Sequence, residues 1–360
     1  MSSLFEPWTS RSLTVPNRIW MAPMCQYSAD TSGPDVGAPN DWHFTHYTSR
    51  AVGGAGLVLS EATAVSPEGR ISPADAGLWN DRQQEAWTRV VAAVRAHGAV
   101  AGIQLAHAGR KASTHRPWEG GGPLGEDEAP WTTLGPSPVP FTDGYPVPHE
   151  LTEAEIGEVV EQFVASARRA LAAGFQVAEV HGAHGYLIGE FLSPHSNRRT
   201  DRYGGDFAGR TRLALEVVEA VRAVWPDELP LFFRVSATDW LPEGGWTPDD
   251  TVRLAGALRA RGVDLLDVSS GGNAAGVTVP TEPGYQVPFA ARVRRETELP
   301  VAAVGLITEP AQAAKILEAG EADAVFLGRV LLREPYWPQR AARELGVAGA
   351  PVPLPYERAH

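Results

Sequence analysis

Eight short apolar runs, each followed by a stretch with helical spacing, constrain the fold of this 360-residue chain most. Strands that alternate with helices are typical of a parallel sheet, and runs without polar alternation suit strands covered on both faces. The pattern predicts an α/β fold in which residues 1–360 form one (β/α)8 TIM barrel domain, and an open doubly wound sheet is the alternative. The predicted strands begin at Ile19, Leu57, Val100, Val177, Leu231, Leu265, Val301 and Ala324.

Capping signals delimit three of the helices. Thr152 and Glu155 form a capping box ahead of apolar residues spaced three and four apart, and Gly174 supplies a left-handed stop. The other two helices open with a threonine shortly before a proline and stop at a glycine, as helix termini commonly do. They extend from Thr247 to Gly262 and from Thr308 to Gly320.

Residues 113–149 lie between the third strand and the third helix, show no periodicity, and are rich in Gly, Pro and Trp. We predict a long loop, which is either a functional lid, because such loops line the active face of a barrel, or a plain surface excursion. Gly120, Gly122 and Gly125 match the pattern G-x-G-x-x-G. Because no strand precedes them and no helix follows, the pattern does not indicate a dinucleotide-binding fold here.

Charge and cysteine content exclude several classes of function. The chain has 31 basic and 43 acidic residues, a formal net charge of −12, which repels nucleic acid and anionic membrane surfaces. Cys25 is the only cysteine, so no internal disulfide and no cysteine-ligated cluster can form. The sequence contains no signal-peptide pattern and no uncharged apolar stretch of about 18 residues. We expect a soluble, cytoplasmic protein that acts on small molecules.

Glycines and an arginine follow the last two predicted strands. Gly305 comes after the seventh strand, and Gly328 with Arg329 comes after the eighth. These are the usual phosphate-binding positions of a TIM barrel, where glycine amides face the anion and an arginine can bind it through two N–H groups. The pattern predicts a cofactor or substrate that carries a phosphate.

Two imidazoles and a phenol follow the fourth strand, at His181, His184 and Tyr186. As metal ligands, the histidines would need a carboxylate or a third imidazole such as His107, and an HExxH helix is absent. As N–H donors, they would bind one oxygen on which negative charge develops, while Tyr186 donates a proton to a neighbouring carbon. We expect the second arrangement and no metal; simple packing at a helix start is the structural alternative.

Several spaced motifs resemble the Old Yellow Enzyme family of flavin-dependent ene-reductases. They are MAPMCQYS, EATAV, QLAHAGRKA, EVHGAHGYLIGEFLSPHSNRRTDRYGG, FFRVSATDW, SSGG followed by PGYQVPFA, and LGRVLLREP, in this order. The Cys and Tyr of MCQY and the closing YER are similar to the bacterial, thermophilic-like branch. The resemblance extends from about residue 4 to residue 358.

The resemblance implies a tightly but non-covalently bound FMN, with NADPH as hydride donor. It places the FMN phosphate at Gly305, Gly328 and Arg329. Arg234 would lie near flavin N1 and stabilise the reduced ring, unless it forms only an interior ion pair. Lys111 is similar to a basic residue near the flavin, with a solvated lysine as the alternative. The flavin ring would be lined by Ala22, Pro23, Met24, Cys25, Ala62 and Gln104.

The resemblance also implies the reaction. NADPH reduces the flavin, and an enone or enal then binds with its oxygen at His181 and His184. Hydride from the reduced flavin reaches the β-carbon, and Tyr186 protonates the α-carbon. Tyr27 would help to hold the substrate, and the Cys25 thiol would tune the flavin potential or act as one more small apolar side chain. The alternatives are a non-catalytic flavin-binding protein and a zinc barrel hydrolase.

Two features depart from the family pattern. The 113–149 loop is longer and brings Trp118 and Trp131, which would narrow the substrate pocket or only cover the barrel mouth. Arg358 matches an arginine that reaches a neighbouring subunit's site in related homo-oligomers, here expected to be a dimer or tetramer. Because Ala359 and His360 follow it instead of an aromatic end, the sequence leaves this intersubunit role open.

Overall fold

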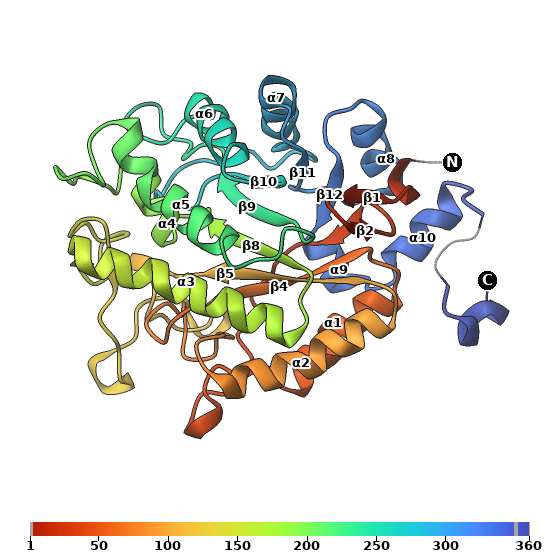
Figure 1. Cartoon of the computed structure of the whole chain (residues 1–360), viewed down its shortest axis with the longest axis horizontal. Helices are drawn as coiled ribbons and strands as arrows, with labels where there is room; N and C mark the ends of the chain where they lie inside the picture. Colours follow the sequence, from red (N-terminus) through yellow and green to blue (C-terminus); the bar gives the residue numbers. More distant parts are fainter. Residues whose placement is uncertain (1–2, 349–351, 360) are drawn as a thin grey trace.

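The computed structural model describes residues 3–348 and 352–359. Eight parallel strands close into one barrel, so the TIM-barrel prediction is confirmed and the open-sheet alternative is wrong (Figure 1). Every strand begins at the residue that the sequence predicts. In order around the barrel they are β3 (Ile19–Met21), β4 (Leu57–Ala64), β5 (Val100–Ala106), β8 (Val177–Gly182), β9 (Leu231–Ser236), β10 (Leu265–Ser269), β11 (Val301–Ala303) and β12 (Ala324–Leu327).

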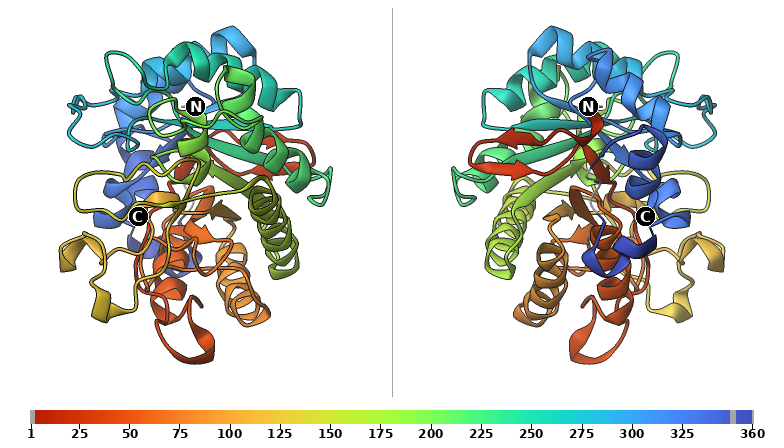
Figure 2. Two further views of the ribbon diagram at one scale, coloured as in Figure 1. Left: turned by 90° about the vertical axis from the view of Figure 1, so that its left-hand side faces the viewer. Right: turned by 90° about the vertical axis from the view of Figure 1, so that its right-hand side faces the viewer.

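Helices surround the barrel on its outside (Figure 2). Outward-facing strand residues such as Val180 and Phe233 pack with helix residues such as Phe163 in one large apolar cluster. Within the described part of the chain, no helix is long and apolar enough to cross a membrane. The helices are α1 (Asp41–Val52), α2 (Asp81–Ala96), α3 (Glu153–Ala173), α4 (Leu187–Leu192), α5 (Phe207–Arg222), α6 (Pro248–Arg259), α7 (Val287–Thr297), α8 (Pro310–Glu318), α9 (Arg329–Arg333) and α10 (Trp337–Glu344).

The predicted caps of α3 and the predicted N-cap of α6 are present, whereas α6 and α8 have their C-caps at Ala260 and Ala319, shortly before the predicted glycines. Thr152 and Glu155 cap α3 reciprocally, and Gly174 ends it with a φ of 93°. α8, however, is preceded by Glu309 as its N-cap, one residue later than predicted. Thr308 lies outside the helix, and its backbone carbonyl accepts a 2.7 Å hydrogen bond from the indole of Trp337. This contact joins the segment before α8 to α10, 29 residues later in the sequence.

A hairpin that the sequence analysis did not predict closes the bottom of the barrel. Its strands are β1 (Trp8–Ser10) and β2 (Leu13–Val15), drawn in red at the end of the molecule that carries both termini (Figure 2, right). Trp8 lies with its ring centroid 5.2 Å from that of Trp20 and 5.8 Å from that of Phe232, inside the barrel. The strands alone leave this end open, and the hairpin fills it.

Residues 113–149 form the predicted long loop, at the opposite end of the barrel from the hairpin (Figure 2). Regular structure within it is limited to two short turns and a two-residue strand, β6 (Leu134–Gly135). β6 pairs with β7 (His149–Glu150), where the loop returns towards α3. The loop is therefore anchored at its far end and covers the side of the barrel where the strands end.

Replacing Trp20 with alanine should lower the free energy of unfolding by about 3–5 kcal/mol, because it leaves a cavity among tightly packed aromatic rings. Trp20 is 0% exposed. Denaturant unfolding followed by circular dichroism measures the change. Trp118→Ala is the matched control, since Trp118 is 64% exposed; its effect should stay within about 0.5 kcal/mol. Equal effects of the two variants would contradict a role for the ring cluster.

Candidate active site

Inward-facing side chains change from apolar to polar along neighbouring strands. Because side chains alternate in a strand, every second residue faces the barrel interior. On β8, Val177 packs in the apolar cluster at the bottom of the barrel, whereas Glu179 and His181 follow on the same face. The parallel register aligns His181 with Arg234 of β9, and Arg234 with Asp267 of β10. The barrel therefore gathers polar side chains towards the carboxyl ends of its strands.

A reversal of the chain after β8 brings His181, His184 and Tyr186 together. His184 and Gly185 have left-handed φ angles of 60° and 66°, so the backbone turns sharply before α4. Glycine is required at 185 because a Cβ there would lie 2.5 Å from the Asn273 backbone. The ring centroid of His181 lies 5.3 Å from that of His184 and 5.2 Å from that of Tyr186. The three side chains converge as the sequence predicts.

Both imidazoles are neutral near pH 7. Burial lowers the pKa of His181 and that of His184 well below 6.5, and the charge of Arg234 lowers both further. Nδ1 of His181 accepts a 3.4 Å hydrogen bond from the backbone N–H of Ala183, which leaves the proton on Nε2. Nε2 of His184 forms a 2.7 Å hydrogen bond with the Ser269 hydroxyl. Each ring is thus held at one nitrogen, and its other nitrogen has no partner among the described residues.

Tyr186 keeps its proton, because burial raises the pKa of its phenol well above 10. The Lys111 ammonium lies 5.0 Å from the centroid of the Tyr186 ring. It also donates hydrogen bonds of 2.9 Å to the carbonyl oxygens of His184 and Gly272. Burial lowers the pKa of Lys111 to about 8. The solvated-lysine alternative is therefore wrong: Lys111 ties the segment after β8 to the segment after β10.

Residues after β3 and residues of the long loop meet beside Tyr186. Cys25, Tyr27 and Trp131 pack with Tyr186 around one small apolar cluster. The ring centroid of Trp118 lies 5.9 Å from that of Tyr27. Burial raises the pKa of the Cys25 thiol well above its usual value, so the thiol stays protonated. The long loop forms part of the site's wall and is not a plain surface excursion.

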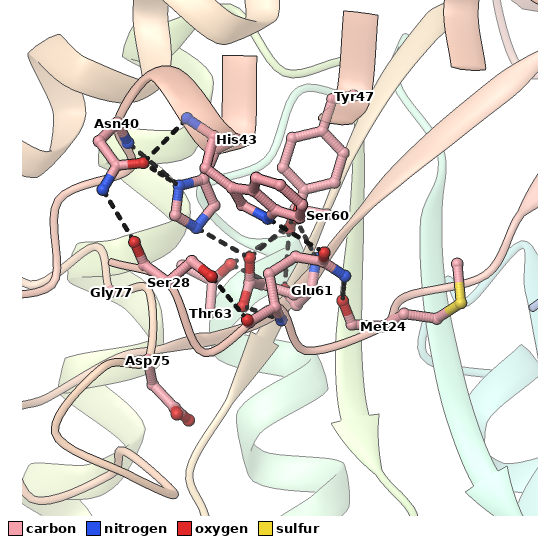
Figure 3. A network of polar contacts seen from close by, with 12 residues as sticks. Met24, Ser28, Asn40, His43, Tyr47, Ser60, Glu61, Thr63, Asp75 and Gly77 are labelled. Carbon is pink, nitrogen blue, oxygen red and sulfur yellow. Dashed lines mark hydrogen bonds and ion pairs between the residues drawn. The ribbon is translucent and has the colours of Figure 1, made fainter. Parts of the chain in front are cut away.

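The residues that hold this wall in place were not predicted from the sequence. Glu61 of β4 is fully buried and accepts hydrogen bonds from the backbone N–H of Gln26 (2.8 Å) and from the hydroxyl of Tyr47 (3.1 Å). Its carboxylate also lies 3.2 Å from Nε2 of His43 (Figure 3). His43 and Tyr47 are four residues apart on α1, so they share one helix face. Two polar rings on a buried face were the signal that could have revealed this network, which fixes the segment carrying Cys25.

The residues predicted to line a flavin ring lie on β4 and β5 or directly after β3. Ala62 and Gln104 are register partners on β4 and β5. The Gln104 amide donates a 2.8 Å hydrogen bond to Glu179. Burial and the charge of Asp267 raise the pKa of Glu179 well above 4.5, so Glu179 is uncharged. Contact with a flavin stays a prediction for Ala22, Pro23, Met24, Cys25, Ala62 and Gln104.

Arg234 is buried and forms the interior ion pair that the sequence analysis named as an alternative. Its Nε lies 3.0 Å from Oδ2 of Asp267. Burial raises the pKa of Asp267 to about 6, against the lowering effect of Arg234, so Asp267 is ionised at pH 7. The geometry is not that of a hydrogen bond, and Nε of Arg234 has no hydrogen-bond partner. A place beside flavin N1 stays a prediction for Arg234.

The predicted phosphate residues line one cavity of about 260 Å³, into which Gly305, Gly328 and Arg329 all face. Gly305 has a φ of 118°, and a Cβ there would lie 2.7 Å from the side chain of Gln286. Arg333, which the sequence analysis missed, lines the same cavity four residues after Arg329, on the same side of α9. Neither guanidinium forms an ion pair with the described residues. The cavity is therefore positively charged and suits a phosphate.

Two further predictions concern metals and subunits. In residues 3–348 and 352–359, no group of three or more His, Cys, Asp or Glu side chains could hold a metal ion, so the zinc hydrolase alternative lacks a ligand set there. Arg358 is exposed on a short 3₁₀ helix, Leu354–Ala359. Its role in a neighbouring subunit stays a prediction, and His360 lies outside the described residues.

Known proteins resemble this chain over almost its whole length. The model of the NADH:flavin oxidoreductase / NADH oxidase family matches residues 3–347. An NADPH dehydrogenase of Geobacillus thermodenitrificans is 49% identical over 355 residues, 99% of this chain and 98% of the relative. The structure of morphinone reductase in complex with tetrahydroNAD is 31% identical, with a TM-score of 0.77 over 96% of this chain and 91% of the other. An old yellow enzyme homologue of Zymomonas mobilis is 28% identical, with a TM-score of 0.79 over 95% and 93%.

Replacing Arg329 with alanine should weaken FMN binding by about 10- to 100-fold, because one charged hydrogen-bond donor to the phosphate is lost. Fluorescence quenching of the flavin on titration with apoprotein measures the dissociation constant. Arg295→Ala is the control, since Arg295 lies on α7 outside the cavity and pairs with Glu296. An unchanged dissociation constant in Arg329→Ala would contradict the assignment of this cavity to the phosphate.

Proposed function

Because the chain belongs to the NADH:flavin oxidoreductase / NADH oxidase family and is an FMN-dependent NADPH dehydrogenase of the Old Yellow Enzyme type, we propose that it reduces the carbon–carbon double bond of α,β-unsaturated carbonyl compounds. The enzyme would thus be an ene-reductase for enones and enals. The observation that carries the proposal is the convergence of two neutral imidazoles and one protonated phenol on a single volume.

The residues present fit FMN. The cavity lined by Arg329 and Arg333 has the size and charge for the phosphate, and the buried guanidinium of Arg234, held at Nε by Asp267, supplies a fixed positive charge for the flavin ring. Gly305, Gly328 and Arg329 would hold the phosphate. When bound, FMN supplies the redox chemistry, taking hydride from NADPH and giving it to the β-carbon of the substrate.

His181 and His184 bind the carbonyl oxygen of the substrate. Hydrogen bonds to this oxygen draw electron density from the double bond, which makes the β-carbon electrophilic, and they stabilise the negative charge that develops on oxygen. The low pKa values of both rings keep them neutral, so they donate hydrogen bonds without carrying a fixed charge. Ser269 holds the ring of His184 in the required orientation.

Tyr186 protonates the α-carbon. Its phenol is the group beside the imidazoles that carries a proton at neutral pH, and its ring lies 5.2 Å from that of His181. The ammonium of Lys111 over the ring stabilises the phenolate that remains after proton transfer. Tyr27, with Trp118 against it, would cover the substrate and keep water away from the reacting carbons.

We also propose that the enzyme works in the cytoplasm as a homo-oligomer, a dimer or tetramer. The single, protonated Cys25 suits a reducing compartment, which also supplies NADPH. The exposed Arg358 near the end of the chain is available to a neighbouring subunit. Analytical ultracentrifugation of the holoenzyme measures the assembly.

An anaerobic bleaching experiment tests the proposed function. NADPH should bleach the yellow holoenzyme, and cyclohexenone should then restore the colour. A non-catalytic flavin-binding protein would stay yellow in NADPH, and a zinc hydrolase would be colourless and lose its activity to chelators. Bleaching by NADPH without recovery in any enone or enal would overturn the ene-reductase proposal and leave the NADPH dehydrogenase activity intact.

His181→Ala or His184→Ala should lower kcat for cyclohexenone by about 10²- to 10³-fold, because one donor to the developing oxyanion is lost. FMN content and the rate of flavin reduction by NADPH should change far less. Stopped-flow absorbance of the two half-reactions separates these effects. His149→Ala is the control, since His149 lies on β7 and contacts Glu155 at the surface. A variant of either site histidine that reoxidises at the wild-type rate would contradict the assigned role.

A further inference from the structure

Tyr186 needs a source of protons, because every turnover that uses its phenol leaves a phenolate. The phenol lies in a wall of packed side chains that includes Cys25 and Tyr27. A substrate held by the imidazoles covers the open side of this wall. If a proton reaches Tyr186 from the side away from the substrate, reprotonation of the phenolate does not have to wait for release of the product.

A small cavity lies behind Tyr186. Its volume is about 10 Å³, at the lower limit of the space that can hold one water molecule. Two of the residues that line it have polar side chains, Tyr186 and Asp75. The other lining residues are alanines, a glycine and Ile71, which cannot exchange protons. A water molecule in this space would find its side-chain partners in Asp75 and Tyr186.

Asp75 is a buried acid without an ion-pair partner among the described residues. It is 2% exposed and belongs to the segment between β4 and α2. Its carboxyl oxygens accept hydrogen bonds from the backbone N–H of Ile71 (2.8 Å), the backbone N–H of Ser72 (3.1 Å) and the hydroxyl of Ser72 (2.7 Å). Ile71 in turn packs in the same cluster as Tyr186. The carboxyl group is thus fixed by Ile71, a residue that packs beside Tyr186, and by Ser72.

We propose that Asp75, through one water molecule in this cavity, returns a proton to Tyr186 after each turnover. The inference rests on the proposed function, in which Tyr186 gives its phenolic proton to the α-carbon. The water then donates a proton to the phenolate as it takes one from the Asp75 carboxyl group, and solvent restores the proton on Asp75. No electrons move in this relay, because the hydride comes from NADPH through the established dehydrogenase activity.

The relative acidities favour transfer in this direction. Burial raises the pKa of Asp75 to about 7, whereas the pKa of Tyr186 lies well above 10. The negative charge of Glu61 on β4 adds to the effect of burial, and the hydrogen bonds from Ile71 and Ser72 oppose it. The other titratable groups that face Asp75 are Arg70 on its own segment and, across the wall, Cys25, Tyr27 and Tyr186.

The acidities also set the pH dependence. Below pH 7, Asp75 carries the proton that the relay needs; above it, the carboxylate prevails and kcat falls as the pH rises. A fall that follows the titration of Asp75 is therefore expected in the wild type.

The Asp75→Asn holoenzyme tests the relay. Because Tyr186 starts each experiment protonated, the first turnover of reduced enzyme with cyclohexenone should proceed at the wild-type rate. Later turnovers should slow by about 10-fold or more, with a larger solvent isotope effect than in the wild type, because reprotonation becomes limiting. Stopped-flow absorbance measures the first turnover, and steady-state NADPH consumption measures the later ones.

Two further variants separate a relay from a structural role. Ala64→Val fills the cavity and leaves Asp75 in place, so it should slow later turnovers as Asp75→Asn does. Ser72→Ala removes the 2.7 Å hydrogen bond to Asp75 but keeps the acid and the cavity, so later turnovers should persist. Because this hydrogen bond lowers the pKa of Asp75, its loss should move the pH at which kcat falls upward. In the infrared, the carbonyl band of protonated Asp75 should titrate near pH 7 in the wild type and be absent in Asp75→Asn.

Unchanged later turnovers and an unchanged isotope effect in both Asp75→Asn and Ala64→Val would overturn the relay and leave the ene-reductase proposal intact. Equal losses in the first and later turnovers of Asp75→Asn would also overturn it, because they would indicate a structural role. Failure of the wild type to reoxidise its flavin with any enone or enal would overturn the proposed function, and the relay with it.

Discussion

The closed parallel register of the barrel is the constraint on which the site depends. Because side chains alternate along a strand and neighbouring strands are aligned, the interior is filled in layers. The lower layers are apolar and are sealed by Trp8 and the hairpin that carries it. Polar side chains can then appear at the next inward positions without lying next to bulk water. Glu179 occupies the inward position before His181 on β8, and Arg234 and Asp267 are aligned with His181 on the next two strands.

Burial sets the protonation state of nearly every group around the candidate site. It keeps His181 and His184 neutral, keeps Tyr186 protonated and leaves Glu179 uncharged. Arg234 and Lys111 supply the positive charge near these groups; Arg234 is held by its ion pair with Asp267, and Lys111 by two hydrogen bonds to backbone carbonyls. A buried site with neutral donors and fixed cations is suited to stabilising an anion that forms only during the reaction.

Segments far apart in the sequence supply the walls of the site. Glu61 on β4 holds the backbone at Gln26 against α1, and the long loop adds Trp118 and Trp131 above it. After β11 and β12, the barrel mouth instead contains the positively charged cavity that Arg329 and Arg333 line. The barrel itself is thus a common support, and the segments after the strands give the site its particular chemistry.

The sequence by itself determined the eight strands, the cap of α3, the placement of His181 and Tyr186, and the grouping of Gly305, Gly328 and Arg329 at one cavity. These features depend on local patterns: apolar runs, capping residues and the position of a residue relative to a strand end. Only the tertiary structure decided that Thr308 lies outside α8, that a hairpin closes the barrel, and that Glu61, Lys111 and Arg333 belong to the site. Each of these features depends on contacts between residues that are distant in sequence. No local pattern specifies such contacts, because they follow from the closure of the barrel and from the space left between packed side chains.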